Sequence, residues 1–129
     1  MRRVFSRLGI AAVVGVTLGA CITPSIPIPP PDPARMQFDF MTVEGMTTVT
    51  FSYPATENYV GSIVYVYNRT LGVGVIEDAR PDGSVGPTGP LEAMVGNEVL
   101  VTFENDLQTV STCVKLKEGM QDSTDYCSP

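Results

Sequence analysis

Hydrophobic and polar residues alternate with a period of two through most of the chain beyond residue 35. In one such run Val49, Phe51 and Tyr53 would point to the same side of a strand, with polar residues between them. Alternation of this kind, rich in β-branched and aromatic residues, predicts strands that bury one face. The predicted strands cover residues 38–40, 47–53, 62–67, 73–76, 98–104 and 110–117.

Glycine, proline, asparagine and aspartate gather between these runs, where each favours a turn for its own backbone reason. No useful stretch shows the 3.6-residue hydrophobic repeat of an amphipathic helix. About seven short strands separated by turns predict an all-β fold, a single immunoglobulin-like antiparallel β-sandwich. We assign this domain to residues 35–129.

Asp82-Gly83-Ser84 is followed, over residues 91–101, by a run of apolar and turn residues. With the strand before it, this pattern resembles bacterial Ig-like and carboxypeptidase-regulatory-like domains over residues 62–104. It departs where Val85 replaces an aromatic residue and where residues 86–90 are inserted. Domains of that kind have no catalytic residues and serve as spacers, display modules or binding modules, so the resemblance implies a non-enzymatic role.

A proline-rich segment precedes the predicted domain. Six of the thirteen residues from 22 to 34 are proline, which lacks a backbone N–H and has a fixed φ. Such a segment prefers polyproline II, so we expect residues 21–34 to form a semi-rigid tether of up to roughly 40 Å. A proline-rich ligand for an aromatic groove is the alternative.

The first twenty residues have the pattern of a secretory signal. Arg2, Arg3 and Arg7 precede an uncharged apolar stretch from residue 8 to residue 20. As a helix this stretch would be roughly 20 Å long, which is too short for the hydrocarbon core of a bilayer. We therefore expect residues 1–20 to be removed rather than to remain as a transmembrane helix.

The end of that stretch, Leu18-Gly19-Ala20-Cys21, resembles the lipobox of bacterial lipoproteins, with Gly19 a less usual residue at its position. The resemblance implies that the signal is cut before Cys21 and that Cys21 carries the acyl chains that anchor the protein. Ile22 follows rather than aspartate, which by the same resemblance favours the outer membrane over the inner membrane. An ordinary signal peptide that leaves Cys21 as a free thiol is the alternative.

Charge and composition exclude several classes of function. The chain has fourteen acidic and eight basic residues and no histidine, so it lacks histidine-dependent catalysis and the basic surface that nucleic-acid binding needs. Removing residues 1–20 takes away three arginines and leaves five basic residues against fourteen acidic ones, a net charge of −9. No spacing of nucleophile, base or metal ligands stands out. We expect a monomer with no catalytic residue, metal or cofactor.

Two cysteines remain once Cys21 is acylated. In an oxidising compartment Cys113 and Cys127 are expected to form a disulfide. Cys113 alternates with apolar residues in its run, so it falls on the polar face of the predicted strand. The disulfide should hold the polar tail, residues 118–129, over the outside of the sheet.

Tyrosines and prolines supply the candidate binding surface. Tyr53, Tyr59 and Tyr126 fall at strand ends or in loops, so they are the aromatic residues that we expect to be exposed. Pro87 and Pro90 restrict the loop of residues 86–90, which makes it the natural segment to enter another protein's cleft.

The stripe of Ile63, Tyr65 and Tyr67 allows two interpretations. If it is exposed, it would form a stacking platform for sugar rings, and if it is buried, it would belong to the core. We favour burial, because the strands of a sandwich routinely bury such stripes.

These features predict a cell-envelope lipoprotein that displays a non-catalytic β-sandwich for structural or protein-binding use, adhesion included. Its partners would be the membrane, through Cys21, and an envelope protein or polysaccharide. The rival hypothesis is a periplasmic inhibitor of a lysozyme-like or other envelope enzyme, with residues 86–90 as the plug. A protruding loop would favour the inhibitor, whereas a flush loop with a bare edge strand would favour the interaction module.

Overall fold

The computed structural model describes residues 27–122 and 126–129. The predicted signal peptide, the lipidation site Cys21 and the first part of the tether lie outside the described residues. The described part contains no helix that could span a bilayer. It holds two 3₁₀ turns, at Pro33–Arg35 and Glu57–Tyr59, and nine strands: β1 (Gln37–Val43), β2 (Met46–Ser52), β3 (Ile63–Asn68), β4 (Val73–Asp78), β5 (Leu91–Glu92), β6 (Glu98–Glu104), β7 (Thr109–Lys115), β8 (Gly119–Met120) and β9 (Tyr126–Cys127).

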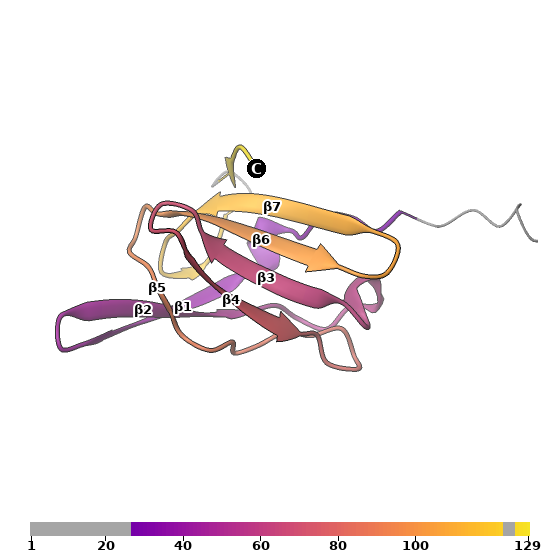
Figure 1. Ribbon diagram of the computed structural model, residues 1–129, viewed down its shortest axis with the longest axis horizontal. Coiled ribbons are helices and arrows are strands. Elements are labelled where there is room, and N and C mark those ends of the chain that lie inside the picture. The colour runs from indigo at the N-terminus through magenta and orange to yellow at the C-terminus, as the bar shows by residue number, and fades with distance from the viewer. Residues whose placement is uncertain (1–26, 123–125) are drawn as a thin grey trace, which may run out of the picture.

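These nine strands form two antiparallel sheets. The four-stranded sheet has the order β5-β2-β1-β8, and the five-stranded sheet has the order β4-β3-β6-β7-β9. Figure 1 shows the two sheets as layers of a sandwich, with the β1–β2 hairpin extending beyond the other strands. The all-β class and the antiparallel sandwich are confirmed, and each of the six alternating runs overlaps one strand.

An aromatic cluster fills the space between the sheets. Phe38 and Phe51, from neighbouring strands, have ring centroids 5.2 Å apart, and Tyr59 stacks on Phe103 at 3.9 Å. These rings are buried together with the inward-facing valines of β3 and β6. Burial of each large apolar side chain contributes about 1.5–3 kcal/mol, so this cluster holds the two sheets together.

The polar tail after β7 joins both sheets at their edges. The predicted disulfide is present, and Cys113 and Cys127 lie directly opposite each other in β7 and β9. β8 pairs with β1 at the edge of the other sheet. The prediction that the tail lies over the outside of the sheet is therefore wrong. Pairing at an edge gives backbone N–H and C=O groups the partners that the outer face cannot offer.

The second half of the predicted tether is packed on the domain. Hydrogen bonds to the domain fix it: Ile28 N–H to Gln108 Oε1 at 2.6 Å, the Tyr59 hydroxyl to Pro29 O at 2.7 Å, the Thr112 hydroxyl to Pro31 O at 2.6 Å and Asp32 N–H to the Tyr53 hydroxyl oxygen at 3.0 Å. Proline cannot donate a backbone hydrogen bond, but its carbonyl accepts one, so hydroxyl groups of the domain can hold a proline-rich strand. The packed domain thus begins near residue 28, whereas the sequence placed its start at residue 35.

Candidate functional site

The β1–β2 hairpin projects from one end of the sandwich as an arm (Figure 1). Its turn residues Glu44 and Gly45 have φ values of 52° and 80°, the positive values that a two-residue type I′ turn requires. Met41, Val43 and Met46 near the tip are 64%, 57% and 56% exposed. The arm therefore ends in an apolar surface with no core beneath it.

One side of this arm has no partner strand within residues 27–122 and 126–129. β8 pairs only with the first two residues of β1. In a hairpin with a two-residue turn, the residues that flank the turn exchange hydrogen bonds, so every second residue counted back from Val43 faces β2. Phe40 and Thr42 therefore direct their N–H and C=O groups to the other side. We call this side of β1, over residues 39–43, the open edge.

β4 is the other long edge strand, and a loop is tied to its C-terminal end. The Gly89 N–H donates to the Glu77 carboxylate at 2.7 Å, while Val73, Gly74 and Ile76 of β4 are exposed. A covering loop and charged side chains are the usual means by which an edge strand avoids pairing with another chain. The open edge of β1 has no such cover in the described part of the chain.

The loop of residues 86–90 lies flush against the four-stranded sheet. Thr88 is only 5% exposed, because its N–H donates to Phe51 O at 3.0 Å and its hydroxyl oxygen accepts the Phe51 N–H at 3.0 Å. Pro87 and Pro90 are exposed, as a binding surface needs. The loop nevertheless does not protrude, as the plug of an inhibitor would.

The structure separates the three candidate tyrosines. Tyr126 is 56% exposed, whereas Tyr53 and Tyr59 are buried at 4% and 1%, so the prediction that all three are exposed is wrong for two of them. Tyr53 packs edge-on against Phe103, on which Tyr59 stacks. Burial raises the pKa of the Tyr59 hydroxyl, which keeps it protonated as the donor to Pro29.

The stripe of Ile63, Tyr65 and Tyr67 faces outward, contrary to the burial that we favoured. The neighbouring Val64 and Val66 are buried instead, while Tyr67 is 44% exposed. Both faces of β3 are apolar, so alternation alone could not show which face is inside.

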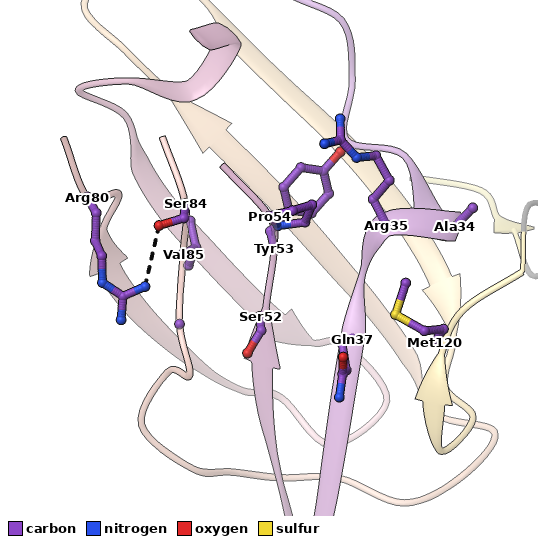
Figure 2. A pocket seen from close by; sticks show the side chains of 11 residues that line it. Ala34, Arg35, Gln37, Ser52, Tyr53, Pro54, Arg80, Ser84, Val85 and Met120 are labelled. Carbon is purple, nitrogen blue, oxygen red and sulfur yellow. Dashed lines mark hydrogen bonds between the residues drawn. The ribbon is translucent and has the colours of Figure 1, made fainter. Parts of the chain in front are cut away.

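A groove of about 460 Å³ lies where β1 begins. Gln37 and Ser52, which face each other in the β1–β2 register, line it between the two strands. Figure 2 shows Arg35 and Arg80 on opposite sides of Tyr53. The complete lining is Ala34, Arg35, Gln37, Ser52, Tyr53, Pro54, Arg80, Ser84, Val85, Gly86 and Met120. No sequence pattern indicated this groove, because its two arginines are far apart in the chain and belong to no motif.

Glu98 and the two cysteines form the one group of potential metal ligands that the described residues bring together, within 4.8 Å of one another. The sulfur atoms are joined in a disulfide, so neither is a thiolate that could bind a metal. The Glu98 carboxylate accepts a hydrogen bond from Arg69 at 2.8 Å, which lowers the pKa of Glu98. This group is therefore a disulfide next to an ion pair and not a metal site.

Comparison with protein-family models, with curated proteins and with solved structures gives no match. The resemblances to lipoproteins and to bacterial Ig-like domains therefore rest on the residues quoted for them.

Proposed function

We propose that this protein is a cell-envelope lipoprotein that displays a non-catalytic β-sandwich for binding another envelope protein. The acylated Cys21 would anchor it, in the outer rather than the inner membrane because Ile22 follows. The partner would add an extended strand to the open edge of β1. The observation that carries this proposal is the long, unguarded side of the projecting hairpin.

The direction of the arm suits this role. The described chain starts at the end of the sandwich where Ile28 is bonded to Gln108, in the turn between β6 and β7. The β1–β2 hairpin projects from the opposite end (Figure 1). From Cys21 to Ile28 an extended chain spans at most roughly 25 Å. An anchor at Cys21 would thus hold the first end close to the membrane and point the arm away from it.

The open edge also has the chemistry that strand addition uses. Hydrogen bonds from Phe40 and Thr42 would supply affinity that does not depend on the partner's sequence. Met41 and Val43 lie on one face of β1 and Thr42 on the other, since side chains alternate along a strand. The partner strand would therefore present apolar residues at alternate positions.

The inhibitor hypothesis ranks second, because its plug lies flush against the sheet. Thr88 is bonded twice to Phe51, so the loop would have to leave the sheet before it could enter a cleft. An inhibitor that acted through residues 86–90 would lose that activity on Pro87→Gly substitution, and an interaction module acting through β1 would not.

Thr42→Pro tests the open edge. Proline removes the outward N–H of Thr42 and the Thr42–Thr47 hydroxyl bond of 3.0 Å, but no backbone hydrogen bond between β1 and β2, so the hairpin should stay folded. Ile76→Pro is the matched control on β4. The Ala79 N–H donates to Ser62 O, just before β3, and N–H directions alternate along a strand, so the Ile76 N–H points away from β3. Both variants should have wild-type thermal unfolding within a few degrees.

The measurement is covalent capture by the mature lipoprotein in the producer's envelope, followed by mass spectrometry. We expect wild type and Ile76→Pro to capture the same dominant protein and Thr42→Pro to lose it. Equal capture by Thr42→Pro, or no dominant partner for wild type, would contradict the proposal.

Cys21→Ala tests the anchor separately. Without a thiol at residue 21 there is no site for the acyl chains, so the protein should leave the membrane fraction. Fractionation of the producing cells checks this. A variant that sediments with the membrane, as wild type does, would contradict lipid anchoring. It would not bear on the open edge, which Thr42→Pro tests.

A further inference from the structure

Cations are rare in this protein, and two of them line one groove. The chain after residue 20 has five basic residues. Arg35 and Arg80 line the groove at the start of β1, and no carboxylate lines it. This absence is notable because fourteen acidic residues are available. The groove is therefore a cationic recess in an acidic protein.

The other three basic residues are engaged elsewhere. Arg69 pairs with Glu98 at 2.8 Å, and Lys117 lies 3.7 Å from Asp122. Lys115 lies opposite Glu98 in the register of β6 and β7. Neither Arg35 nor Arg80 lies within ion-pair distance of a carboxylate among the described residues.

Both groove arginines are held in place by uncharged groups. The Arg35 guanidinium lies 5.6 Å from the centre of the buried Tyr53 ring, a cation–π contact that leaves its N–H donors free. Arg80 Nη1 donates to Ser84 Oγ at 3.5 Å. Each guanidinium thus has an uncharged neighbour at the groove, and neither is neutralised by a carboxylate.

The nearest acid on the Arg80 side is already engaged. Asp82 Oδ1 accepts hydrogen bonds from the Ser84 N–H at 2.9 Å and from the Ser84 hydroxyl at 2.6 Å, and these bonds lower the pKa of Asp82. Asp82 therefore supports Ser84, and its charge also interacts with Arg80 without forming an ion pair, so the remaining Arg80 N–H donors stay available to an external anion.

The space between the arginines sets the shape of a ligand. Figure 2 shows Tyr53 and Pro54 between Arg35 and Arg80, with Met120 on the Arg35 side. Apolar walls of this kind suit an apolar segment, and a guanidinium at each end suits a carboxylate through paired N–H···O bonds.

We propose that this groove binds a ligand with a carboxylate at each end and an apolar middle. The site goes beyond the strand-addition role and is separate from it, because the groove lies at the start of β1 and the open edge lies at residues 39–43. The ligand is either an acidic peptide segment or a free dicarboxylate, and the probes below distinguish the two.

The test is a titration followed by the Nε–H signals of Arg35 and Arg80 in NMR spectra of the mature chain in uncharged detergent micelles. The probes are the end-capped tetrapeptide ELLE, its neutral analogue QLLQ and the dicarboxylate suberate. We expect saturable shifts with ELLE and none with QLLQ. Suberate that binds as tightly as ELLE identifies a free dicarboxylate, whereas binding by ELLE alone identifies a peptide.

Charge-matched variants locate the site. Arg35→Gln and Arg80→Gln should each weaken binding at least about fivefold, and Lys115→Gln, which removes the same charge from the other sheet, less than about twofold. Arg35→Gln also removes the contact with Tyr53, so its unfolding midpoint is measured, and Arg80→Gln, which touches no core residue, carries the test independently.

Three results would overturn the proposal. They are equal binding of ELLE and QLLQ, equal weakening by Lys115→Gln, and no saturable shift with ELLE or suberate up to roughly 10 mM. Thr42→Pro should leave the titration unchanged, so a failure here and a failure of strand addition are distinguishable.

Discussion

β1 and β4 are both outer strands of hairpins, and their free sides differ. Beside β4 the Glu77 carboxylate holds the Gly89 N–H and with it a covering loop. Beside β1 the cover ends with β8 at Phe38. β4 packs on the core through Val75, whereas β1 beyond Phe40 has left it. The edge strand that packs on the core has a loop tied to one end, and the edge strand that projects from the core has no such contact along residues 39–43.

The edge of β7 adds a third case. β9 pairs with it, and the Cys113–Cys127 disulfide joins the two strands covalently. Cys113 is fully buried and Cys127 is partly buried, so the disulfide is part of the folded domain. Disturbing an edge that a strand or loop covers should therefore lower the unfolding free energy more than disturbing the open edge.

Removal of the disulfide should have the largest effect on stability. The two cysteines are 14 residues apart, and a loop of this length corresponds to about 3 kcal/mol of unfolding free energy in the chain-entropy model. We expect Cys113→Ala with Cys127→Ala to lose this amount in urea unfolding, and Thr42→Pro to lose less than about 1 kcal/mol. Equal losses would contradict the difference between the closed and the open edge.

Tyr59→Phe should have an intermediate effect. The substitution removes the hydrogen bond from the Tyr59 hydroxyl to Pro29 O and leaves the ring in the core, so it should cost about 1 kcal/mol. Faster amide exchange at Ile28 would show that the proline-rich segment has loosened. Tyr67→Phe, at an exposed ring, is the control and should change neither quantity.

Glu77→Ala should release the loop that is tied to β4 and so make the edge of β4 more like that of β1. The Gly89 N–H loses its acceptor, which should cost roughly 0.5–1 kcal/mol and speed amide exchange at Gly89. Asp78→Ala, at the neighbouring position, removes the same charge and should leave Gly89 unchanged. Unchanged exchange in Glu77→Ala would show that the loop covers β4 without this bond.

The smallest effect concerns pH. The Arg69 hydrogen bond lowers the pKa of Glu98 in the folded state, so this pair stabilises the fold above the ordinary pKa of glutamate. The stabilisation is lost as pH falls through the lowered folded value. The difference in unfolding midpoint between wild type and Arg69→Gln should therefore be larger at pH 7 than at about pH 3. A difference that does not change with pH would contradict the pairing.

The strands were predictable from the sequence because alternation reports one-sided burial. The run at residues 98–104 coincides with β6, where Val99, Val101 and Phe103 are buried. The same reasoning failed for β3, since a strand with two apolar faces carries no signal for which face is inside. Two-residue strands such as β8 and β9 are too short to show any period.

The candidate sites were less predictable because they depend on contacts between distant residues. Tyr59 looked like a loop residue, yet it stacks on Phe103 and bonds Pro29. The groove needs Arg35 and Arg80, 45 residues apart in the chain, to line the same recess on opposite sides of Tyr53. The open edge depends on where β8 stops. None of these facts is local in the sequence, and only the fold brings the residues together.

Amide hydrogen exchange at the open edge tests the central claim most directly. The mature lipoprotein is compared free and with the partner that covalent capture identifies. The account predicts that the Phe40 and Thr42 amides, which point away from β2, slow at least about tenfold on binding, while the Ile76 amide on β4 does not change. A bound partner that leaves Phe40 and Thr42 as fast as in the free protein would contradict strand addition to β1.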